Sequence, residues 1–298
     1  MSAADLTGPG LRVEGLRRRR AVNRSMEALA WVSGAIAVGF LVLIVWSVAR
    51  KGASELNFNL LTKTALPLGL NPTAPQGLAN AFAGTLVIVG IATLMALPAG
   101  ILVAVYLVEF ARLSVRNIVT LALDMLNGVP AIVIGIFVYG LFVLGHGQSG
   151  LAASFALACL MLPLVARATM EVLVLVPNSL REASLGLGVP RWRTTLSIVL
   201  PQTVGGVVTG TVLAVARVAG ETAPILFTSS LVGTQLQWNP HHALQTVPVA
   251  IFELSESPDP ADHARAWAAA LVLMLFILLA SLGGRWVATR HRRKLTSR

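Results

Sequence analysis

The amino-acid sequence predicts an all-α, polytopic membrane protein with six transmembrane helices. The chain has 298 residues, of which 55% are hydrophobic and only 12% are charged, and that much apolar surface cannot be enclosed in one soluble core. Six apolar runs are also long enough to cross a bilayer, which takes about 20 residues. These runs lie near residues 27–48, 82–108, 117–144, 150–175, 203–230 and 267–287.

The first run resembles a signal peptide in two respects, because it follows arginines at 17–20 and because residues 47–49 look like a small-residue cleavage site. Signal-peptide cores, however, span only about 7 to 15 residues. This run is longer, and Trp31 and Trp46 lie near its ends, where interfacial anchors are found. We therefore expect a retained anchor helix over residues 27–48.

The distribution of Lys and Arg predicts that both termini are cytoplasmic, because positive charges concentrate on that side of a membrane. Most of the 23 Lys and Arg residues fall in the terminal tails or in the loops after the second and fourth runs. We assign Arg167, Arg181, Arg191 and Arg193 to the inside loop after the fourth run. The net charge of +10 then reflects topology and contact with anionic lipid rather than nucleic-acid binding.

The predicted organisation has a core flanked by tails. It consists of a basic cytoplasmic tail (1–26), the anchor helix (27–48), an extracytoplasmic loop (49–81), a core domain (82–287) with a cytoplasmic coupling loop (178–201), and a second basic tail (288–298). No metal site is expected, because Cys159 is alone and the adjacent His241 and His242 lack helical ligand spacing.

Residues 182–201 form a polar, basic segment between two apolar runs. The segment contains Glu182-Ala183-Ser184, then Gly188, Ile198 and Leu200-Pro201. This spacing resembles the EAA loop of importer permeases of the ATP-binding-cassette (ABC) type, with Ser184 in place of the usual second Ala. The resemblance implies a short cytoplasmic coupling helix in which Glu182, Ala183 and Gly188 fit a groove of a separate ATPase.

Arg217 and Glu221 are the most informative residues inside an apolar run. On a continuous helix they lie one turn apart on the same face and can touch. Arg217 is near the middle of the run 203–230, where a lone charge costs about 2.5 to 3.5 kcal/mol. Either the two residues neutralise one another to permit burial, or Arg217 offers a donor fork to an oxyanion while Glu221 weakens the attraction. Glu221 could also accept a hydrogen bond from the protonated oxygen of phosphate.

Gly220, Pro224 and Asp124 also lie within apolar runs and lead to predictions. Gly220 and Pro224 loosen the helix, so that a kink is expected there. Asp124 is the other carboxylate well inside an apolar run. It is either an ion partner of Arg217 or of another arginine, or a structural residue near the cytoplasmic interface.

The stretch from Ala216 to Pro224 is similar to the RxxGETAP signature of the permease subunits of the phosphate-specific uptake system. The stretch from Asp124 to Gly135 is similar to the GVPSIVIG segment of the PstA branch of those permeases. The resemblance extends over about residues 78–290. It implies the type I fold of ABC importer permeases and a substrate path that includes Arg217, Glu221 and Thr222.

The resemblance further implies a half-transporter in the bacterial plasma membrane. Its partners would be a PstC-type permease, a cytoplasmic ATPase dimer and an extracytoplasmic phosphate-binding protein. The sequence contains no GxxxxGK[ST] phosphate-binding loop, so ATP and Mg²⁺ would be bound by the ATPase and the chain would have neither a cofactor nor catalytic residues of its own.

Three alternative functions must also be considered. The cargo could be another oxyanion, such as sulfate, molybdate or phosphonate. A proton-coupled secondary carrier would use Asp124 and Glu221 as titrating groups, but it should show discontinuous helices in two related halves, and the sequence has no evident internal repeat. A non-transporting membrane scaffold would leave the Arg217–Glu221 pair and the EAA-like spacing without a purpose.

Overall fold

A computed structural model describes residues 16–65, 76–230 and 235–296 of the chain, and all regular structure within these ranges is helical. The chain divides into two compact units, residues 1–50 and 51–298. The first unit is essentially the long helix α1 (Leu16–Gly52). None of its apolar stretch is buried, as expected of a helix that meets lipid.

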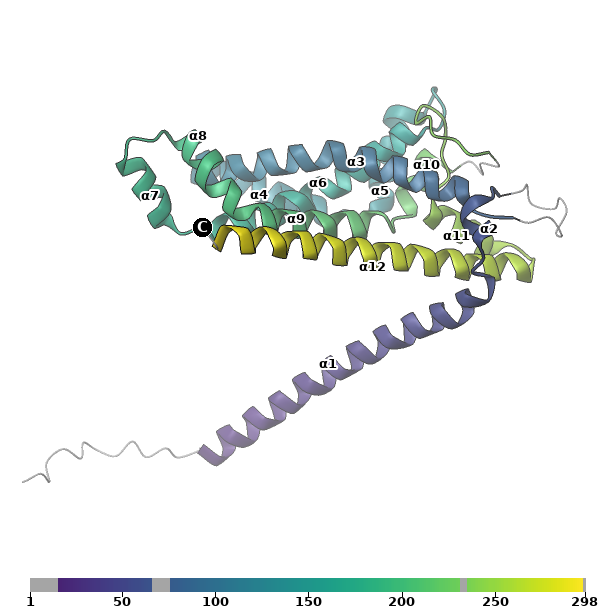
Figure 1. Cartoon of the computed structure of the whole chain (residues 1–298), viewed down its shortest axis with the longest axis horizontal. Helices are drawn as coiled ribbons and strands as arrows, with labels where there is room; N and C mark the ends of the chain where they lie inside the picture. The colour runs from purple at the N-terminus through teal and green to yellow at the C-terminus, as the bar shows by residue number, and fades with distance from the viewer. Residues whose placement is uncertain (1–15, 66–75, 231–234, 297–298) are drawn as a thin grey trace, which may run out of the picture. The chain divides into compact units, whose positions relative to one another are not determined.

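The second unit is built around four long helices (Figure 1). They are α3 (Ala79–Val105), α6 (Gly150–Val174), α9 (Leu200–Val218) and α12 (Pro260–Thr296). Helix α3 packs on α6, α6 on α9, and α9 on α12. The apolar centre includes the fully buried Ile88, Leu157, Met161 and Val165.

Small residues let α9 approach α6 closely. A Cβ atom at Gly206 would lie 2.5 Å from the side chain of Val172, and one at Gly210 would lie 2.5 Å from the Cβ of Ala168. Helices in a membrane gain most of their association energy from such close packing, because lipid tails are as apolar as the side chains. Helix α9 is therefore tightly joined to α6.

Five helices are long and apolar enough to cross a membrane, and a bent pair raises the number to six within the described residues. This confirms the predicted all-α, polytopic fold. The bent pair replaces the straight span expected over 117–144: α4 (Leu113–Gly128) and the segment Ala131–Val143, which begins with α5 (Ala131–Val138), meet at an angle of 96°. The break lies at Pro130, which has no N–H to donate and disfavours a helical residue before it.

The expected span over 203–230 is also interrupted. Helix α9 ends at Val218, and a separate short helix, α10 (Ala223–Thr228), follows. Gly220 lies within this break and Pro224 is the second residue of α10, which confirms the predicted kink and shows that it is a complete interruption. Arg217 consequently lies in the last turn of α9, and its predicted place near the middle of a span was wrong.

The two ends of the helix bundle carry different short elements (Figure 1). One end carries α7 (Asn178–Gly186), α8 (Arg191–Thr194) and the C-terminal end of α12. The opposite end carries α2 (Phe58–Thr62), α10 and α11 (Val247–Glu256). Arg167 lies within α6 rather than in the inside loop to which we assigned it, because α6 continues to Val174.

Candidate functional site

The two broken spans meet where α5 packs on α10. A small cavity of about 50 Å³ lies beside this crossing. It is lined by Leu126, Asn127, Val129 and Ala131 from the α4–α5 break, by Leu160 and Leu164 from α6, and by Arg217, Val218 and Glu221 from the end of α9. The fold therefore brings together the two motif-like stretches that are separated by about 90 residues in the sequence.

Arg217 is exposed in this chain, and its side chain has no ion pair or hydrogen bond to any residue that the structure describes. Its backbone carbonyl accepts a hydrogen bond from the N–H of Gly220 at 3.2 Å. The last turn of a helix carries partial negative charge, which favours a cation at this position. The end of α9 thus stabilises the positive charge of Arg217, and no acidic side chain among the described residues neutralises it.

Glu221 lines the same cavity and is half-buried. An ion pair with Arg217, one of the two alternatives considered for these residues, is absent from the described part of the chain. The physical reason is the end of α9 at Val218, because the spacing of four residues brings side chains together only on a continuous helix. Both charged groups are therefore open to an external ligand.

Thr222 is the residue that precedes α10, and its carbonyl accepts hydrogen bonds from the N–H groups of Ile225 and Leu226, both at 3.1 Å. It lies outside the residues that line the cavity. The structure therefore brings Arg217 and Glu221 together at the cavity and gives Thr222 a place in the backbone turn beside them.

Asp124 pairs with Arg167, with 3.2 Å between Asp124 Oδ1 and Arg167 Nε. The side chains are 45% and 39% exposed, respectively, and a pair this open contributes about 1 kcal/mol or less. The sequence indicates that Asp124 either pairs with Arg217 or another arginine, or plays a structural role. In the structure its ion partner is Arg167 and not Arg217.

The EAA-like segment begins within α7, with Glu182-Ala183-Ser184 in its second half, which confirms a short helix at this point. Glu182 and Ala183 are exposed on it, and the side chain of Glu182 has no partner among the described residues. Gly188 follows the helix with a φ of +78°, a left-handed conformation that glycine adopts at little cost. Ser184 is buried, and its hydroxyl lies 2.8 Å from the hydroxyl of Thr194 on α8.

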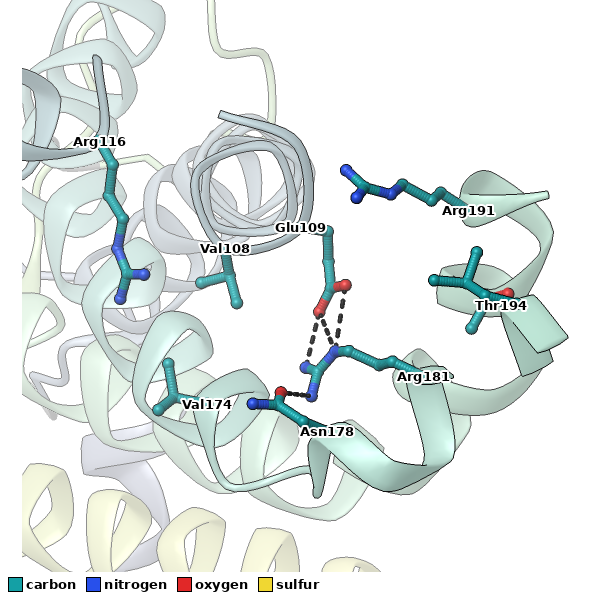
Figure 2. A pocket seen from close by; sticks show the side chains of 9 residues that line it. Val108, Glu109, Arg116, Val174, Asn178, Arg181, Arg191 and Thr194 are labelled. Atoms are coloured by element: carbon teal, nitrogen blue, oxygen red, sulfur yellow. Dashed lines mark hydrogen bonds and ion pairs between the residues drawn. The ribbon is translucent and has the colours of Figure 1, made fainter. Parts of the chain in front are cut away.

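Beside α7 lies a second pocket, of about 370 Å³ (Figure 2). It is lined by Val108, Glu109, Arg116, Val174, Asn178, Arg181, Leu185, Arg191 and Thr194. Glu109 and Arg181 face one another in it, with 2.7 Å between Glu109 Oε1 and Arg181 Nη2.

Sequence reasoning did not select Glu109 or Arg181 as functional residues. The available signals were an acidic residue at the end of the second apolar run and an arginine directly before Glu182. As for metals, no group of three His, Cys, Asp or Glu side chains gathers anywhere in the described ranges.

Comparison with known proteins identifies the class. Residues 96–293 match the family described as binding-protein-dependent transport system inner membrane component, so the chain is a permease component of such a transport system. The fold is similar to that of a bacterial ABC transporter involved in the import of the acidic polysaccharide alginate (TM-score 0.63, 15% identity, 92% of this chain and 99% of the other). It is also similar to the MetNI methionine ABC transporter (TM-score 0.57, 16% identity, 72% and 94%). The predicted type I importer fold is confirmed.

Proteins with similar sequences identify the particular permease family. The chain is 39% identical over 284 residues to phosphate transport system permease protein PstA 1 of Mycobacterium tuberculosis, covering 93% of this chain and 91% of the relative. It is 39% identical over 267 residues to PstA of Haemophilus influenzae, covering 89% and 93%. The chain belongs to the PstA family of permeases.

Proposed function

We propose that this chain is one of two permease subunits of an ATP-driven importer of inorganic phosphate, and that it forms half of the translocation path. The PstA relatives are named as components of a phosphate transport system. The observation that carries the proposal is Arg217, which has no ion partner among the described residues and lies on a cavity where two broken spans cross.

The chemistry of this cavity suits a phosphate ion. Arg217 presents a planar, permanently charged fork of donors that matches the oxygens of a tetrahedral anion. Glu221, at the same cavity, accepts a hydrogen bond from the protonated oxygen of phosphate and weakens the net attraction, so that the anion can leave. Because neither side chain is held by the other, both can turn to the ion as it passes.

The proposal includes partner subunits. A PstC-type permease completes the path, a phosphate-binding protein delivers the ion from outside, and a cytoplasmic ATPase dimer, which holds ATP and Mg²⁺, docks on α7. Both termini of this chain face the cytoplasm on this view. In support, α7 and the end of α12 lie at the same end of the bundle (Figure 1), and the last residues of α12 are rich in arginine.

The relatives favour phosphate over sulfate, molybdate or phosphonate. A proton-coupled carrier is also disfavoured, because the family is one of binding-protein-dependent transport components. In addition, Asp124, one of its two titrating groups, is paired with Arg167.

The test is uptake by the complete complex in liposomes, with ATP on the α7 side and the binding protein on the other. Labelled phosphate should enter, and excess unlabelled sulfate or molybdate should not compete. Arg217→Gln should lower uptake about tenfold or more, since a lost charge-assisted hydrogen bond is worth about 1.5 to 3 kcal/mol. Arg24→Gln, at an exposed arginine of α1, is the matched control. Full uptake by Arg217→Gln would refute the role of this residue.

A further inference from the structure

Helix α7 is attached to the rest of the fold by few side chains. Of its nine residues only Ser184 is buried. Among the described residues, α7 side chains bond to other elements at two positions, Ser184 and Arg181. Ser184 contacts Thr194 at the end of α8, whereas Arg181 contacts the turn that continues α3 and the end of α6. These two residues are the polar connections through which a movement of α7 reaches the spans.

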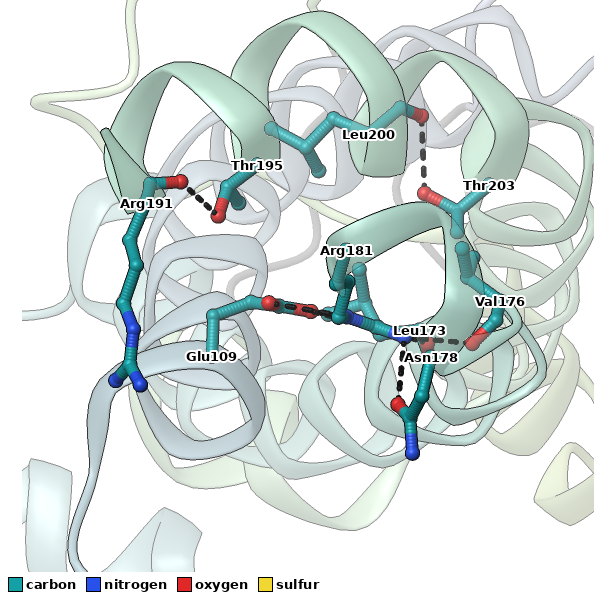
Figure 3. A network of polar contacts seen from close by, with 9 residues as sticks. All are labelled: Glu109, Leu173, Val176, Asn178, Arg181, Arg191, Thr195, Leu200 and Thr203. Carbon is teal, nitrogen blue, oxygen red and sulfur yellow. Dashed lines mark hydrogen bonds and ion pairs between the residues drawn. The ribbon is translucent and has the colours of Figure 1, made fainter. Parts of the chain in front are cut away.

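Arg181 uses every donor that an arginine has. Its Nε bonds to the carboxylate of Glu109 at 3.2 Å, and Nη2 reaches the same carboxylate at 2.7 Å and the carbonyl of Leu173 at 2.9 Å. Its Nη1 donates to the carbonyl of Val176 at 2.6 Å and to the side chain of Asn178 at 3.3 Å. A guanidinium has five N–H donors in a fixed plane, so this one side chain joins three segments at once (Figure 3).

The environment of this contact makes it stiff. The side chains of Arg181 and Glu109 are only 18% and 10% exposed, so that water competes poorly for their bonds. The carbonyl of Leu173 lies in the last turn of α6 and that of Val176 two residues beyond the helix end, where the partial negative charge of the helix end attracts a cation. Glu109 belongs to the π-helical turn Tyr106–Phe110, which directly continues α3.

We infer that Arg181 is a positioning residue for transport: it transmits movement of the coupling helix α7 to α3 and α6 through Glu109 and the end of α6. This inference rests on the proposed function, in which an ATPase moves α7. Glu182 faces the ATPase, and Arg181, one residue before it, faces the spans. Without the Arg181 connection, α7 moves with the ATPase while α3 and α6 follow incompletely, so that ATP hydrolysis continues and phosphate import falls.

The test uses the complete complex in liposomes, with three measurements: recovery of the ATPase with the chain, ATP hydrolysis stimulated by the binding protein, and uptake of labelled phosphate. In Arg181→Gln we expect normal ATPase recovery, continued hydrolysis, and at least about a fivefold rise in ATP consumed per phosphate imported. Arg181→Lys should rescue this ratio in part, because an ammonium can still pair with Glu109 but cannot reach all the acceptors.

Two further variants separate this role from simple support of the fold. Glu109→Gln, which leaves α7 and its EAA-like residues unchanged, should raise the same ratio by a smaller factor. Arg116→Gln is the matched control, because Arg116 lines the same pocket from α4 without a bond to α7.

The outcomes are distinct. Loss of ATPase recovery in both Arg181→Gln and Glu109→Gln would show that the contact only supports the docking surface and would overturn the inference, as would an unchanged ATP-to-phosphate ratio in both. If the unaltered chain itself neither recovers an ATPase nor imports phosphate, the proposed function fails instead.

Discussion

Gly135 lies directly against Pro224, and a Cβ atom at position 135 would be 2.6 Å from the Cα of Pro224. This contact joins α5 to α10 beside the cavity of Arg217. The neighbour is backbone, which cannot turn aside as a flexible side chain could. Any side chain at position 135 must therefore push the two broken spans apart.

Gly135→Ala should accordingly destabilise the protein by about 1 to 3 kcal/mol, the usual cost of overpacking, and should lower phosphate uptake. Thermal unfolding in detergent and uptake in liposomes measure the two effects. Gly140→Ala is the control, since nothing lies within 4 Å of a Cβ at position 140. Equal stability of the two variants would contradict the importance of the contact.

Glu182→Lys should prevent recovery of the ATPase while the chain remains inserted in the membrane. Glu182 is exposed on α7, and a reversed charge at a docking surface costs several kcal/mol through like-charge or unpaired contacts. Co-purification measures the loss, and Glu27→Lys, at an exposed residue of α1, is the comparison. ATPase recovery at normal yield with Glu182→Lys would count against docking on α7.

Ser184→Ala should cost only about 1 kcal/mol or less, the worth of one ordinary hydrogen bond. The hydroxyl of Thr194 would not be left unpaired, because it also lies 3.3 Å from the carbonyl of Pro190. Ser184→Leu, by contrast, places a large side chain in a buried position and should reduce ATPase recovery. Thermal unfolding and co-purification distinguish the two variants, and a severe loss with Ala would show that the hydroxyl itself is required.

Glu253 gives the protein a pH-dependent stability. It lies on α11, outside the membrane-spanning helices, and burial raises its pKa, although a hydrogen bond from Gln245 partly opposes the shift. The folded state therefore holds this proton more tightly than the unfolded state. The resulting stabilisation is complete below the ordinary pKa of a Glu, near 4.3, and is lost as the pH rises through the raised pKa.

Glu253→Gln should thus increase the melting temperature at neutral pH and flatten the dependence on pH above about 4.3. The replacement amide keeps an acceptor for the Nε2 of Gln245, which lies 2.6 Å from the carboxylate. Melting temperatures of both forms over a pH series provide the measurement, with the exposed Glu256→Gln as the control. A lower melting temperature for Glu253→Gln at neutral pH would show that the charge is favourable.

The spans could be predicted from the sequence because hydropathy and length are local properties. The break between α9 and α10 was foreseeable at Gly220 and Pro224, but its completeness was not, since a kinked helix and an interrupted one have the same composition. The contact expected between Arg217 and Glu221 on a continuous helix is absent for that reason. Contacts between distant segments leave no periodic signal in a single sequence. The pairs Glu109–Arg181 and Asp124–Arg167 could therefore be recognised only once the fold was known.

The glycine-lined contact of α9 with α6 has a mechanical consequence. At Gly206 and Gly210 the backbone of α9 lies against the side chains of Val172 and Ala168, and such close packing favours tilting of α6 and α9 as a single unit. A helix bends most easily where its regular hydrogen bonding stops, and α9 stops at Val218, one residue after Arg217. A rocking motion of α6 and α9 together would therefore move the guanidinium along the proposed phosphate path while its own helix stays straight.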